Sequence, residues 1–371
     1  MSMRNIIVIF SGYNQRAVIA FLRCLAKNHV KNYAIIAASD KDTILKTDYR
    51  EKVFYIRKKK ELDLDEICSI FYMIRKKYMV ESILVPPTTE SLNRFMLENR
   101  NVIETQHCVI PLVDKELYIR VSDKDSFWRL CKENGLAVPS NIELSKKYIG
   151  PYVAKPKYYM SNDGKVYSPV LVLNSELHEN FWNKYNIDDF MYQEYLTGES
   201  YYLLYYFSTN GSIYSFSQVN YAQQLDGKSI LAAAAADIHK QDISQNYVDL
   251  FRGLNYQGFV MVELRKNHGR YYMIEANPRF WGPSQLFVDA GVTFFERFLL
   301  DYSFLSEVKE EDIDYETVYL WSGGCDTELI TSDNCAWLGE GRKKVTEMWN
   351  KFLKMDIYNR PDTNNILKLR T

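Results

Sequence analysis

The sequence of 371 residues lacks the patterns that mark several large classes of protein. Its six cysteines show no CxxC spacing and its five histidines are dispersed, so neither residue type predicts a metal site or a disulfide framework. No apolar stretch reaches the roughly 18 residues of a membrane span, and no signal-peptide pattern is present. A net charge of −1 gives no electrostatic footprint for nucleic acid. We therefore expect a cytoplasmic protein with reduced thiols and with neither a nucleic-acid nor a membrane partner.

The amino-terminal third predicts a doubly wound α/β unit. Apolar strands are expected over residues 5–10, 33–38 and 82–85, and amphipathic helices over 16–26 and 65–78. Strands that alternate with helices at this spacing form parallel βαβ units. The whole chain is long for one core, so we expect two or three domains.

The turn after the first strand is Ser11-Gly12-Tyr13-Asn14, which lacks G-x-G-x-x-G and so predicts no dinucleotide site. The amino-terminus of the helix that follows could still accept an anion. Ser11, Gly12 and Glu90 are expected at the carboxyl ends of strands, where such sheets bind ligands. A capping or turn role is the alternative for each of the three.

A hairpin near residue 270 carries the clearest chemistry. Apolar runs over 259–264 and 270–274 flank Asn267-His268-Gly269, the composition of a short loop. Pairing around that three-residue loop predicts three cross-strand pairs: Lys266–Arg270, Glu263–Met273 and Glu275–Met261. Because strand side chains alternate, two faces follow. The first comprises Met261, Glu263, Met273, Glu275 and Asn277, and the second, expected to face the core, Val260, Val262, Leu264, Tyr272 and Ile274.

Two carboxylates and one amide on a single face form an oxygen ligand set. Glu263 and Glu275 would repel one another unless one keeps its proton or a cation lies between them. Mg²⁺ is commonly held by one or two carboxylates together with substrate phosphates, so Glu263, Glu275 and Asn277 are the candidate metal ligands. The alternative is an edge hairpin whose acids face water.

The residues that follow the hairpin resemble a known superfamily. Glu275-Ala276-Asn277-Pro278-Arg279, with an acid on the preceding strand, is similar to the metal-binding end of ATP-grasp proteins. Arg279-Phe280-Trp281-Gly282 is most similar to the carbamoyl-phosphate-synthase-like ligase branch. The resemblance implies a fold of α/β plus α+β class, with a Rossmann-like pre-ATP-grasp domain followed by a two-subdomain ATP-grasp fold. It implies four parts: 1–120, the pre-ATP-grasp domain; 121–197, the small subdomain; 198–300, the large subdomain with the metal site; and 301–371, a carboxyl-terminal extension.

The same resemblance assigns nucleotide ligands. Ser122-Asp123-Lys124 opens an expected helix to about residue 134 with Ser122 as its N-cap, and Lys124 matches a lysine that contacts the α-phosphate. Lys155, in the strand ending Ala154-Lys155-Pro156, is expected to bind the α- and β-phosphates. Gln193, Glu194 and Leu196 match the residues of the hinge that holds adenine. Glu199 matches the acid that binds the ribose hydroxyls. ATP and Mg²⁺ are the implied cofactors, with Mn²⁺ able to substitute, and Arg279 is the implied catalytic residue.

Three features depart from the superfamily pattern. The expected lid, residues 157–165, contains one glycine where a glycine-rich loop is usual. Glu199 comes one position before the usual place of the ribose acid, which Ser200 occupies. No arginine is present over 213–236, where many such ligases carry one, and only Gln223, Gln224 and Lys228 are available. The alanines over 232–236 are compatible with a strand or, by propensity, with a helix.

The function implied is an ADP-forming ligase that joins a small-molecule carboxylate to an amine or other nucleophile through an acyl phosphate. An amino-acid-like substrate and a modified metabolite are both compatible, and so is a homodimer. The three departures favour an alternative, a nucleotide-binding module of the same fold without turnover. The complete set of Glu263, Glu275 and Asn277 favours the enzyme.

Overall fold

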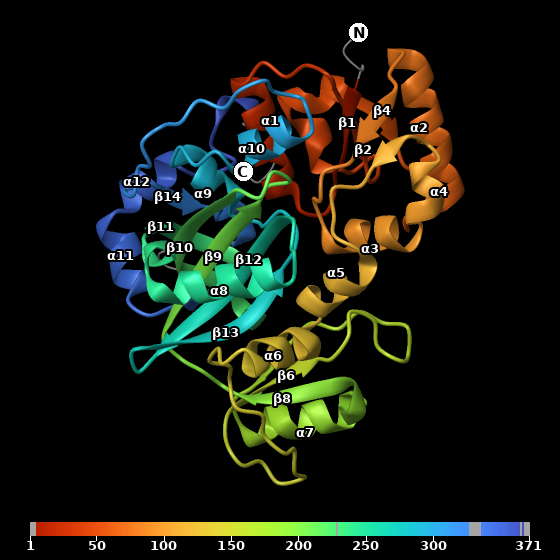
Figure 1. The fold of residues 1–371 in the computed structure, drawn as a ribbon. Coiled ribbons are helices and arrows are strands. Elements are labelled where there is room, and N and C mark those ends of the chain that lie inside the picture. The colour runs from red at the N-terminus through yellow and green to blue at the C-terminus, as the bar shows by residue number, and fades with distance from the viewer. Residues whose placement is uncertain (1–4, 228, 326–334, 364–365, 367–371) are drawn as a thin grey trace.

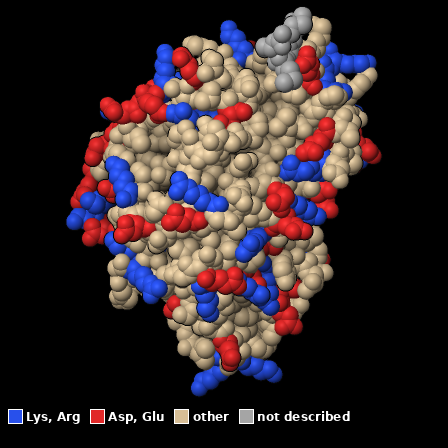
Figure 2. Space-filling model, viewed as in Figure 1, with Lys and Arg blue, Asp and Glu red and all other residues tan. Residues whose placement is uncertain are grey.

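The computed structural model describes residues 5–227, 229–325, 335–363 and 366. Over these residues the chain builds three β-sheets, each from a different stretch of sequence, with helices packed on them (Figure 1). No helix among them is long and apolar enough to cross a membrane. On the face shown in Figure 2, acidic and basic side chains are interspersed, without one large area of a single sign.

The first sheet confirms the expected Rossmann-like unit, because its five strands are parallel in the order β3-β2-β1-β4-β5. The strands are β1 Asn5–Phe10, β2 Tyr33–Ala37, β3 Val53–Ile56, β4 Ser82–Leu84 and β5 Cys108–Val109. The helices of this region are α1 Gln15–Lys27, α2 Leu64–Tyr78, α3 Glu90–Glu98, α4 Arg100–Glu104 and α5 Lys115–Ser122. Alternate residues of β1 enter two different hydrophobic clusters, so both faces of the strand are buried. This explains why β1 is a continuous apolar run.

The second sheet is small and antiparallel, in the order β7-β6-β8. Its elements are α6 Lys124–Glu133, β6 Tyr152–Pro156, β7 Val170–Val172, α7 Ser175–Lys184 and β8 Phe190–Glu194. The expected N-cap at Ser122 is wrong: Ser122 ends α5, and Asp123 precedes α6. The hydroxyl of Ser122 instead accepts a hydrogen bond from Arg94 at 2.8 Å.

The third sheet contains the candidate metal hairpin and is antiparallel, in the order β13-β12-β9-β10-β11-β14, with β15 beside β10. Its strands are β9 Glu199–Phe207, β10 Ile213–Gln224, β11 Ile230–Ala236, β12 Gly258–Asn267, β13 Arg270–Asn277, β14 Val318–Leu320 and β15 Cys335–Trp337. Its helices are α8 Asp242–Gly253, α9 Ser284–Asp289, α10 Phe294–Asp301, α11 Gly341–Glu347 and α12 Trp349–Lys354. The alanines of β11 are strand, because the run pairs with β10 and β14 on both sides.

The described residues after 301 contribute two strands to this third sheet. β14 pairs with β11 and β15 with β10, and both strands belong to the same buried cluster as Phe352 of α12. Short 3-10 turns link the elements of the chain: Thr43–Lys46, Asp48–Lys52, Ile187–Asp189, Leu225–Gly227, Ile238–Lys240, Ser322–Gly324 and Pro361–Thr363.

Candidate active site

The hairpin β12–β13 places its two glutamates directly opposite each other. Glu263 pairs with Glu275, and Asn267 pairs with Arg270 around a two-residue loop. Both loop residues, His268 and Gly269, have positive φ (47° and 77°), the backbone of the tight hairpin turns that match strand twist. The register expected from the sequence is therefore wrong, although the two carboxylates share a face as expected.

The two-residue loop shifts the expected pairs by one position, and a β-bulge in β13 shifts those beyond Leu264 by one more. Ile274 is an extra residue between Glu275 and Met273, which pair with the consecutive residues Glu263 and Leu264. The extra residue reverses the alternation of every side chain before it in the strand. Met273 consequently lies in the buried cluster with Leu264, and Tyr272 pairs with Arg265, on the face of Glu263. The faces expected for Met273 and Tyr272 are thus exchanged.

The two carboxylates have different surroundings. Burial raises the pKa of Glu263 to about 7, although Arg265 at 3.7 Å opposes that rise. The Glu275 side chain is 25% exposed, and Lys124 at 3.3 Å and a hydrogen bond from Asn277 more than offset its partial burial and lower its pKa to about 2. One carboxyl of the pair therefore stays ionised across the neutral range while the other titrates within it. That is the behaviour of two acids placed together with too little positive charge between them.

Lys124 and Lys155 converge on this pair from the small sheet and the helix before it. Lys124 begins α6 and forms the ion pair with Glu275, and its pKa is raised because Glu275 and Glu90 outweigh the effect of burial. Lys155 is 5 % exposed at the end of β6, and burial lowers its pKa to about 8. Its ammonium donates to the carbonyl of the bulge residue Ile274 at 2.8 Å. The structure thus brings together both lysines identified from the sequence.

Asn277 and Arg279 are connected to Glu275 by hydrogen bonds. The Asn277 amide donates to Glu275 Oε1 at 2.8 Å, and its Oδ1 accepts from Arg279 Nη2 at 2.9 Å. The other terminal nitrogen of Arg279 donates to the carbonyl of Phe280 at 3.0 Å. The guanidinium is therefore fixed beside the carboxylates rather than free in solvent.

A cavity of about 240 Å³ opens next to these groups. Its walls include Lys124, Glu275, Asn277 and Arg279, and it also contacts Glu90 at the start of α3. Its remaining cover comes largely from the segment between β6 and β7, which contributes Tyr158 and Tyr159 of the lid and Tyr167 beyond it. The cavity is thus bounded by all three sheets or by segments adjoining them.

Arg94 of α3 holds this cover in place. Its guanidinium donates to Glu90 at 3.0 Å, forms an ion pair with Asp123, and lies 4.5 Å from the centre of the Tyr159 ring. The lid itself is tied internally, since Ser161 N–H donates to the carbonyl of Lys165 at 2.9 Å. Aromatic stacking on an arginine therefore holds the lid in a chain that lacks the usual glycines. No local pattern identifies Arg94 as part of the site, because Asp123 and Tyr159 lie 29 and 65 positions away and only Glu90 is near it in sequence.

The hinge residues lie on β8 beside the segment that precedes β6. Glu194 is bound twice to Ser140: its N–H donates to the Ser140 carbonyl at 3.0 Å and its carboxylate accepts from the Ser140 N–H at 2.7 Å. Gln193 is 1 % exposed, and its Oε1 is buried without a hydrogen-bond partner. Leu196 is buried just beyond the strand. An unsatisfied buried acceptor in this position is suited to an incoming amine donor.

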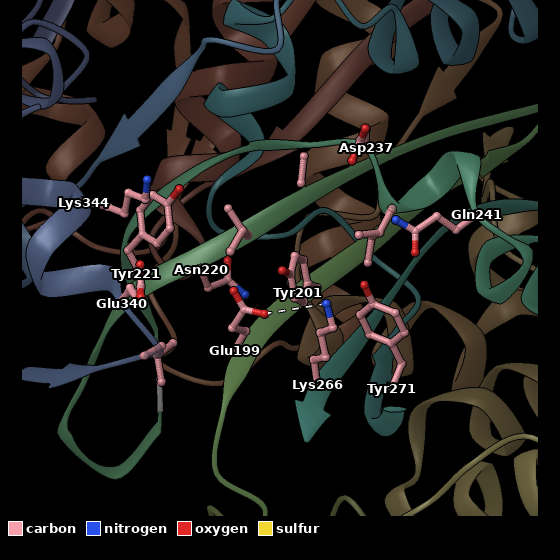
Figure 3. Close-up of a pocket in the computed structure, with 14 residues that line it drawn as sticks. Glu199, Tyr201, Asn220, Tyr221, Asp237, Gln241, Lys266, Tyr271, Glu340 and Lys344 are labelled. Carbon is pink, nitrogen blue, oxygen red and sulfur yellow. Dashed lines mark ion pairs between the residues drawn. The ribbon is translucent and has the colours of Figure 1, made fainter. Parts of the chain in front are cut away.

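Glu199 lies apart from all of these groups. It pairs with Lys266 across β9 and β12, which puts it on the opposite face of the sheet from Glu263, and its carboxylate lies 4.0 Å from Lys266. There it lines a separate cavity of about 290 Å³ with Tyr201 and Tyr271 (Figure 3). Ser200 is on the face of Glu263 and accepts a hydrogen bond from Asn220 at 3.0 Å. The structure does not bring Glu199 together with the other expected nucleotide ligands.

The segment 213–236 contains no arginine of its own, but an arginine from another part of the chain contacts it. Arg16 of α1 donates to the carbonyl of Ile230 at 3.0 Å and to the hydroxyl of Ser229 at 3.1 Å, at the start of β11. More than 200 residues separate these partners in sequence, so no local motif could identify the contact. The Nε2 of Gln224 donates to the carbonyl oxygen of Gly324 at 2.9 Å, and Lys228 lies outside the described residues.

Comparison with known proteins confirms the fold. No protein-family model and no curated protein sequence matches this chain. Biotin carboxylase from Campylobacter jejuni, solved as a β-γ-ATP complex, superposes with a TM-score of 0.61 at 13% identity, over 84% of this chain and 74% of that one. N5-carboxyaminoimidazole synthetase from Staphylococcus aureus, complexed with ADP, gives 0.57 at 13%, over 95% and 98%. L-amino acid ligase from Bacillus licheniformis gives 0.57 at 15%, over 83% and 75%. The chain therefore has the ATP-grasp fold expected from its motifs.

Proposed function

We propose that this protein is an ADP-forming ligase, which uses ATP to activate the carboxylate of a small molecule and joins it to an amine or another nucleophile. One observation carries the proposal: Glu263 and Glu275 face each other beside Lys124, Lys155 and Arg279, next to a covered cavity. The similarity to a biotin carboxylase, a carboxyaminoimidazole synthetase and an amino acid ligase supports the same class of reaction.

The nucleotide is assigned to the space between the hinge and the hairpin. The unsatisfied Oε1 of Gln193 would accept the adenine amine, with Glu194 and Leu196 offering backbone groups to the purine edge. Lys124 and Lys155 would neutralise the phosphates, since α6 and β6 hold these two ammonium groups toward the same pair of acids. Glu199 is omitted from this assignment because it lies on the other face of the sheet.

The donor set of Glu263, Glu275 and Asn277 fits Mg²⁺ or Mn²⁺. Two opposed carboxylates, one with a pKa raised to about 7, form a site that gains from a cation. The Asn277 amide lies beside them with its nitrogen toward Glu275 and its oxygen toward Arg279, so the amide would have to turn over to offer its oxygen to the ion. No cluster of three or more His, Cys, Asp or Glu residues occurs in the described part of the chain, so phosphate oxygens would complete the coordination. When bound, the ion neutralises charge on the β- and γ-phosphates.

The reaction then needs positioning and charge stabilisation rather than a covalent nucleophile. Arg279 would stabilise the transferring phosphoryl group while a carboxylate oxygen of the substrate attacks the γ-phosphorus and ADP leaves. The amine nitrogen next attacks the acyl carbon, phosphate leaves, and the amine proton passes to solvent. The tyrosine-rich lid would exclude water from the acyl phosphate during this interval.

The direct test is ADP release from Mg·ATP by the purified full chain, with pooled amino acids and with pooled small carboxylates. ADP release that depends on one pool and is lost in Glu275→Gln would support the ligase and begin to identify its carboxylate. If ATP raises the melting temperature but no pool releases ADP, the ligase proposal is contradicted for those substrates. Absence of any ATP-induced shift would contradict the nucleotide site itself.

A nucleotide-binding module without turnover is the second candidate. It is favoured by the position of Glu199 on the far face and by a lid that is tied internally, with its Ser161 N–H already used. Such a module would bind Mg·ATP tightly but release no ADP with any carboxylate. Comparison of the ATP dissociation constant with the rate of ADP release separates the two functions.

A further inference from the structure

Two buried hydrogen-bond donors near the carboxyl edge of the first sheet have no partner among the described residues, and neither belongs to the cavity at Arg279. One is Nη1 of Arg57, the residue that follows β3, and the other is Nε2 of Gln15, the first residue of α1. Arg57 is only 5 % exposed and Gln15 only 9 %. A buried guanidinium nitrogen without an acceptor is costly, because the desolvation of a charged group is not repaid.

Both donors adjoin the loop between β1 and α1, residues 11–14. The Oε1 of Gln15 accepts from the hydroxyl of Ser11 at 3.0 Å and from the N–H of Gly12 at 3.3 Å, which fixes the amide and directs Nε2 away from these groups. The guanidinium carbon of Arg57 lies 5.9 Å from the centre of the Tyr13 ring. Tyr13 is 58 % exposed, so the loop connects these buried groups to solvent.

The helix that starts here is also open to an anion. α1 has 13 residues and no acidic residue in its first turn. Asn14 at its N-cap position makes no capping hydrogen bond; its amide donates instead to the carbonyls of Thr88 and Phe280, each at 3.0 Å. An uncapped helix amino-terminus presents N–H groups and a partial positive charge.

The nearby carboxylates are largely occupied. Asp42 accepts from the Ser11 hydroxyl at 2.9 Å and from the N–H groups of Ile44 and Ala38. Glu66 of α2 accepts from the N–H of Lys58 at 2.8 Å, and its second oxygen is buried without a partner. A water molecule that bridges Oε2 of Glu66 and Nη1 of Arg57 is therefore the competing explanation for these two unsatisfied atoms.

We propose that the loop 11–14, the first turn of α1 and Arg57 form a binding site for an oxyanion, either a phosphate or a carboxylate group. The carboxyl edge of a parallel sheet is where such sheets bind ligands, and a helix amino-terminus with an arginine supplies the two kinds of donor that phosphate oxygens prefer. The site does not depend on the ligase assignment. The anion is either a free ion or the remote anionic group of a larger ligand.

Isothermal titration calorimetry of the full chain with inorganic phosphate tests the proposal. Arg57→Met keeps the bulk of the side chain and removes the charge, and Gln15→Glu keeps the shape and replaces the donor by an oxygen. Both should weaken phosphate binding at least about tenfold. Arg50→Met, at an exposed arginine of the same region, is the matched control and should bind as the wild type does. If Arg57→Met does not fold, as judged by circular dichroism, Gln15→Glu decides alone.

Phosphate could also enter the cavity at Arg279, so Arg279→Met is titrated in parallel. Binding that survives in Arg279→Met and is lost in Gln15→Glu and Arg57→Met supports the site. Binding that is lost only in Arg279→Met overturns it, and so does absence of phosphate binding to the wild type, which would leave water as the partner of Arg57. Where ADP release occurs, phosphate that competes with the carboxylate substrate, and no longer does so in Gln15→Glu, identifies the anion as part of that substrate. Non-competitive behaviour identifies a free ion.

Discussion

At the scale of single residues, the two acids of the hairpin and the acid at the start of β9 make an informative comparison. Glu275 touches Lys124 and Asn277, whereas Glu199 is on the opposite face of the sheet with Lys266. All three groups are carboxylates in the same sheet, but Glu263 and Glu275 share one face, whereas Glu199 is on the other face and is more exposed. Substitution of Glu275 and substitution of Glu199 should therefore have clearly different effects on ADP release.

We expect Glu275→Gln to lower ADP release at least about 100-fold, because it removes one of the two carboxylates that we propose as metal ligands and leaves Lys124 without its partner. Glu199→Gln is the matched control, and its rate should stay within about twofold of the wild type because exposed ion pairs of this kind contribute little. Steady-state ADP release with each purified variant measures both effects. Equal loss in the two variants would contradict the separation of the faces.

A pH dependence of nucleotide binding follows from Glu263 and Lys155. The pKa of Glu263 is raised from 4.5 to about 7, so the folded chain holds a proton that the unfolded chain loses. This contribution to stability is fully present below pH 4.5 and is lost as the pH rises through 7. A cation needs the ionised carboxylate, so Mg·ATP affinity should increase up to about pH 7.

The basic limb of the same profile comes from Lys155, whose pKa is lowered from 10.5 to about 8. Above that pH the ammonium charge is lost and phosphate binding should weaken. Calorimetric titration with Mg·ATP from pH 5.5 to 9.5 should therefore give a maximum between the two pKa values, about 7 and about 8. Glu263→Gln should remove the acidic limb and retain the basic one. A flat profile in the wild type would contradict the assignment of both groups.

At the scale of elements, the lid departs most from the superfamily pattern, because tyrosines take the place of the usual glycine-rich loop. Tyr159 lies on the guanidinium of Arg94, and Arg94 is anchored by Glu90 and Asp123. Because the anchors belong to α3 and to the residue before α6, lid position depends on the contact between the first sheet and the small sheet. A cation–π contact of this kind contributes on the order of 1 kcal/mol, enough to shift a lid equilibrium several-fold.

Tyr159→Ala should therefore uncouple the reaction. With the carboxylate and amine pair identified by ADP release, we expect ADP to form while the yield of ligated product per ADP falls severalfold, because water reaches the acyl phosphate. Tyr159→Phe retains the ring and should preserve the wild-type ratio. Product and ADP are quantified in the same reaction, and an unchanged ratio in Tyr159→Ala would contradict the role of this stacking in water exclusion.

The hairpin shows how far sequence reasoning reaches at this scale. The pattern identified both strands, the shared face of Glu263 and Glu275, and the turn before Arg279. It did not identify the bulge at Ile274, because an extra residue leaves no mark in the order of apolar and polar side chains. The same limit applies to Glu199, because its face is set by the pairing of β9 with β12, where it lies opposite Lys266.

Contacts between distant segments were beyond sequence reasoning altogether. The expected parallel sheet follows from local periodicity. The strand that carries Lys155 and the helix that carries Lys124 follow from short local motifs, although the N-cap expected at Ser122 is wrong. Arg94 and Arg16 do not, because their partners are fixed only when the three sheets pack together. β11 is a related case, since pairing on both edges overrides the helical propensity of its alanines.

At the scale of the whole molecule, the carboxyl-terminal segment fastens the first sheet region to the third. Arg23 of α1 donates to both carboxylate oxygens of Asp362, at 2.9 and 2.8 Å, and to the carbonyl of Ile357 at 2.8 Å. It also donates to Gln285 of α9 at 2.9 Å. Tyr49, which belongs to the 3-10 turn Asp48–Lys52, donates to Asp362 at 2.9 Å. One guanidinium thus joins α1, α9 and the segment after α12.

Arg23→Met should lower the free energy of unfolding by about 2–3 kcal/mol, because it leaves a carboxylate and a carbonyl of limited exposure without their donor. Lys27→Met is the matched control on the same helix: its ion pair with Glu311 is 49 % exposed on both sides, and its loss should cost less than about 1 kcal/mol. Urea unfolding followed by tryptophan fluorescence measures both values. The pair Arg23→Met and Asp362→Asn, combined in a double-mutant cycle, isolates the coupling between the two residues. Because Asp362 belongs to the carboxyl-terminal segment and Arg23 to the first helix, a coupling near zero would mean that the segment adds strands to the third sheet without fastening the first region to it. A substantial coupling would show that residues 301–371 help to hold together the regions that bound the active-site cavity.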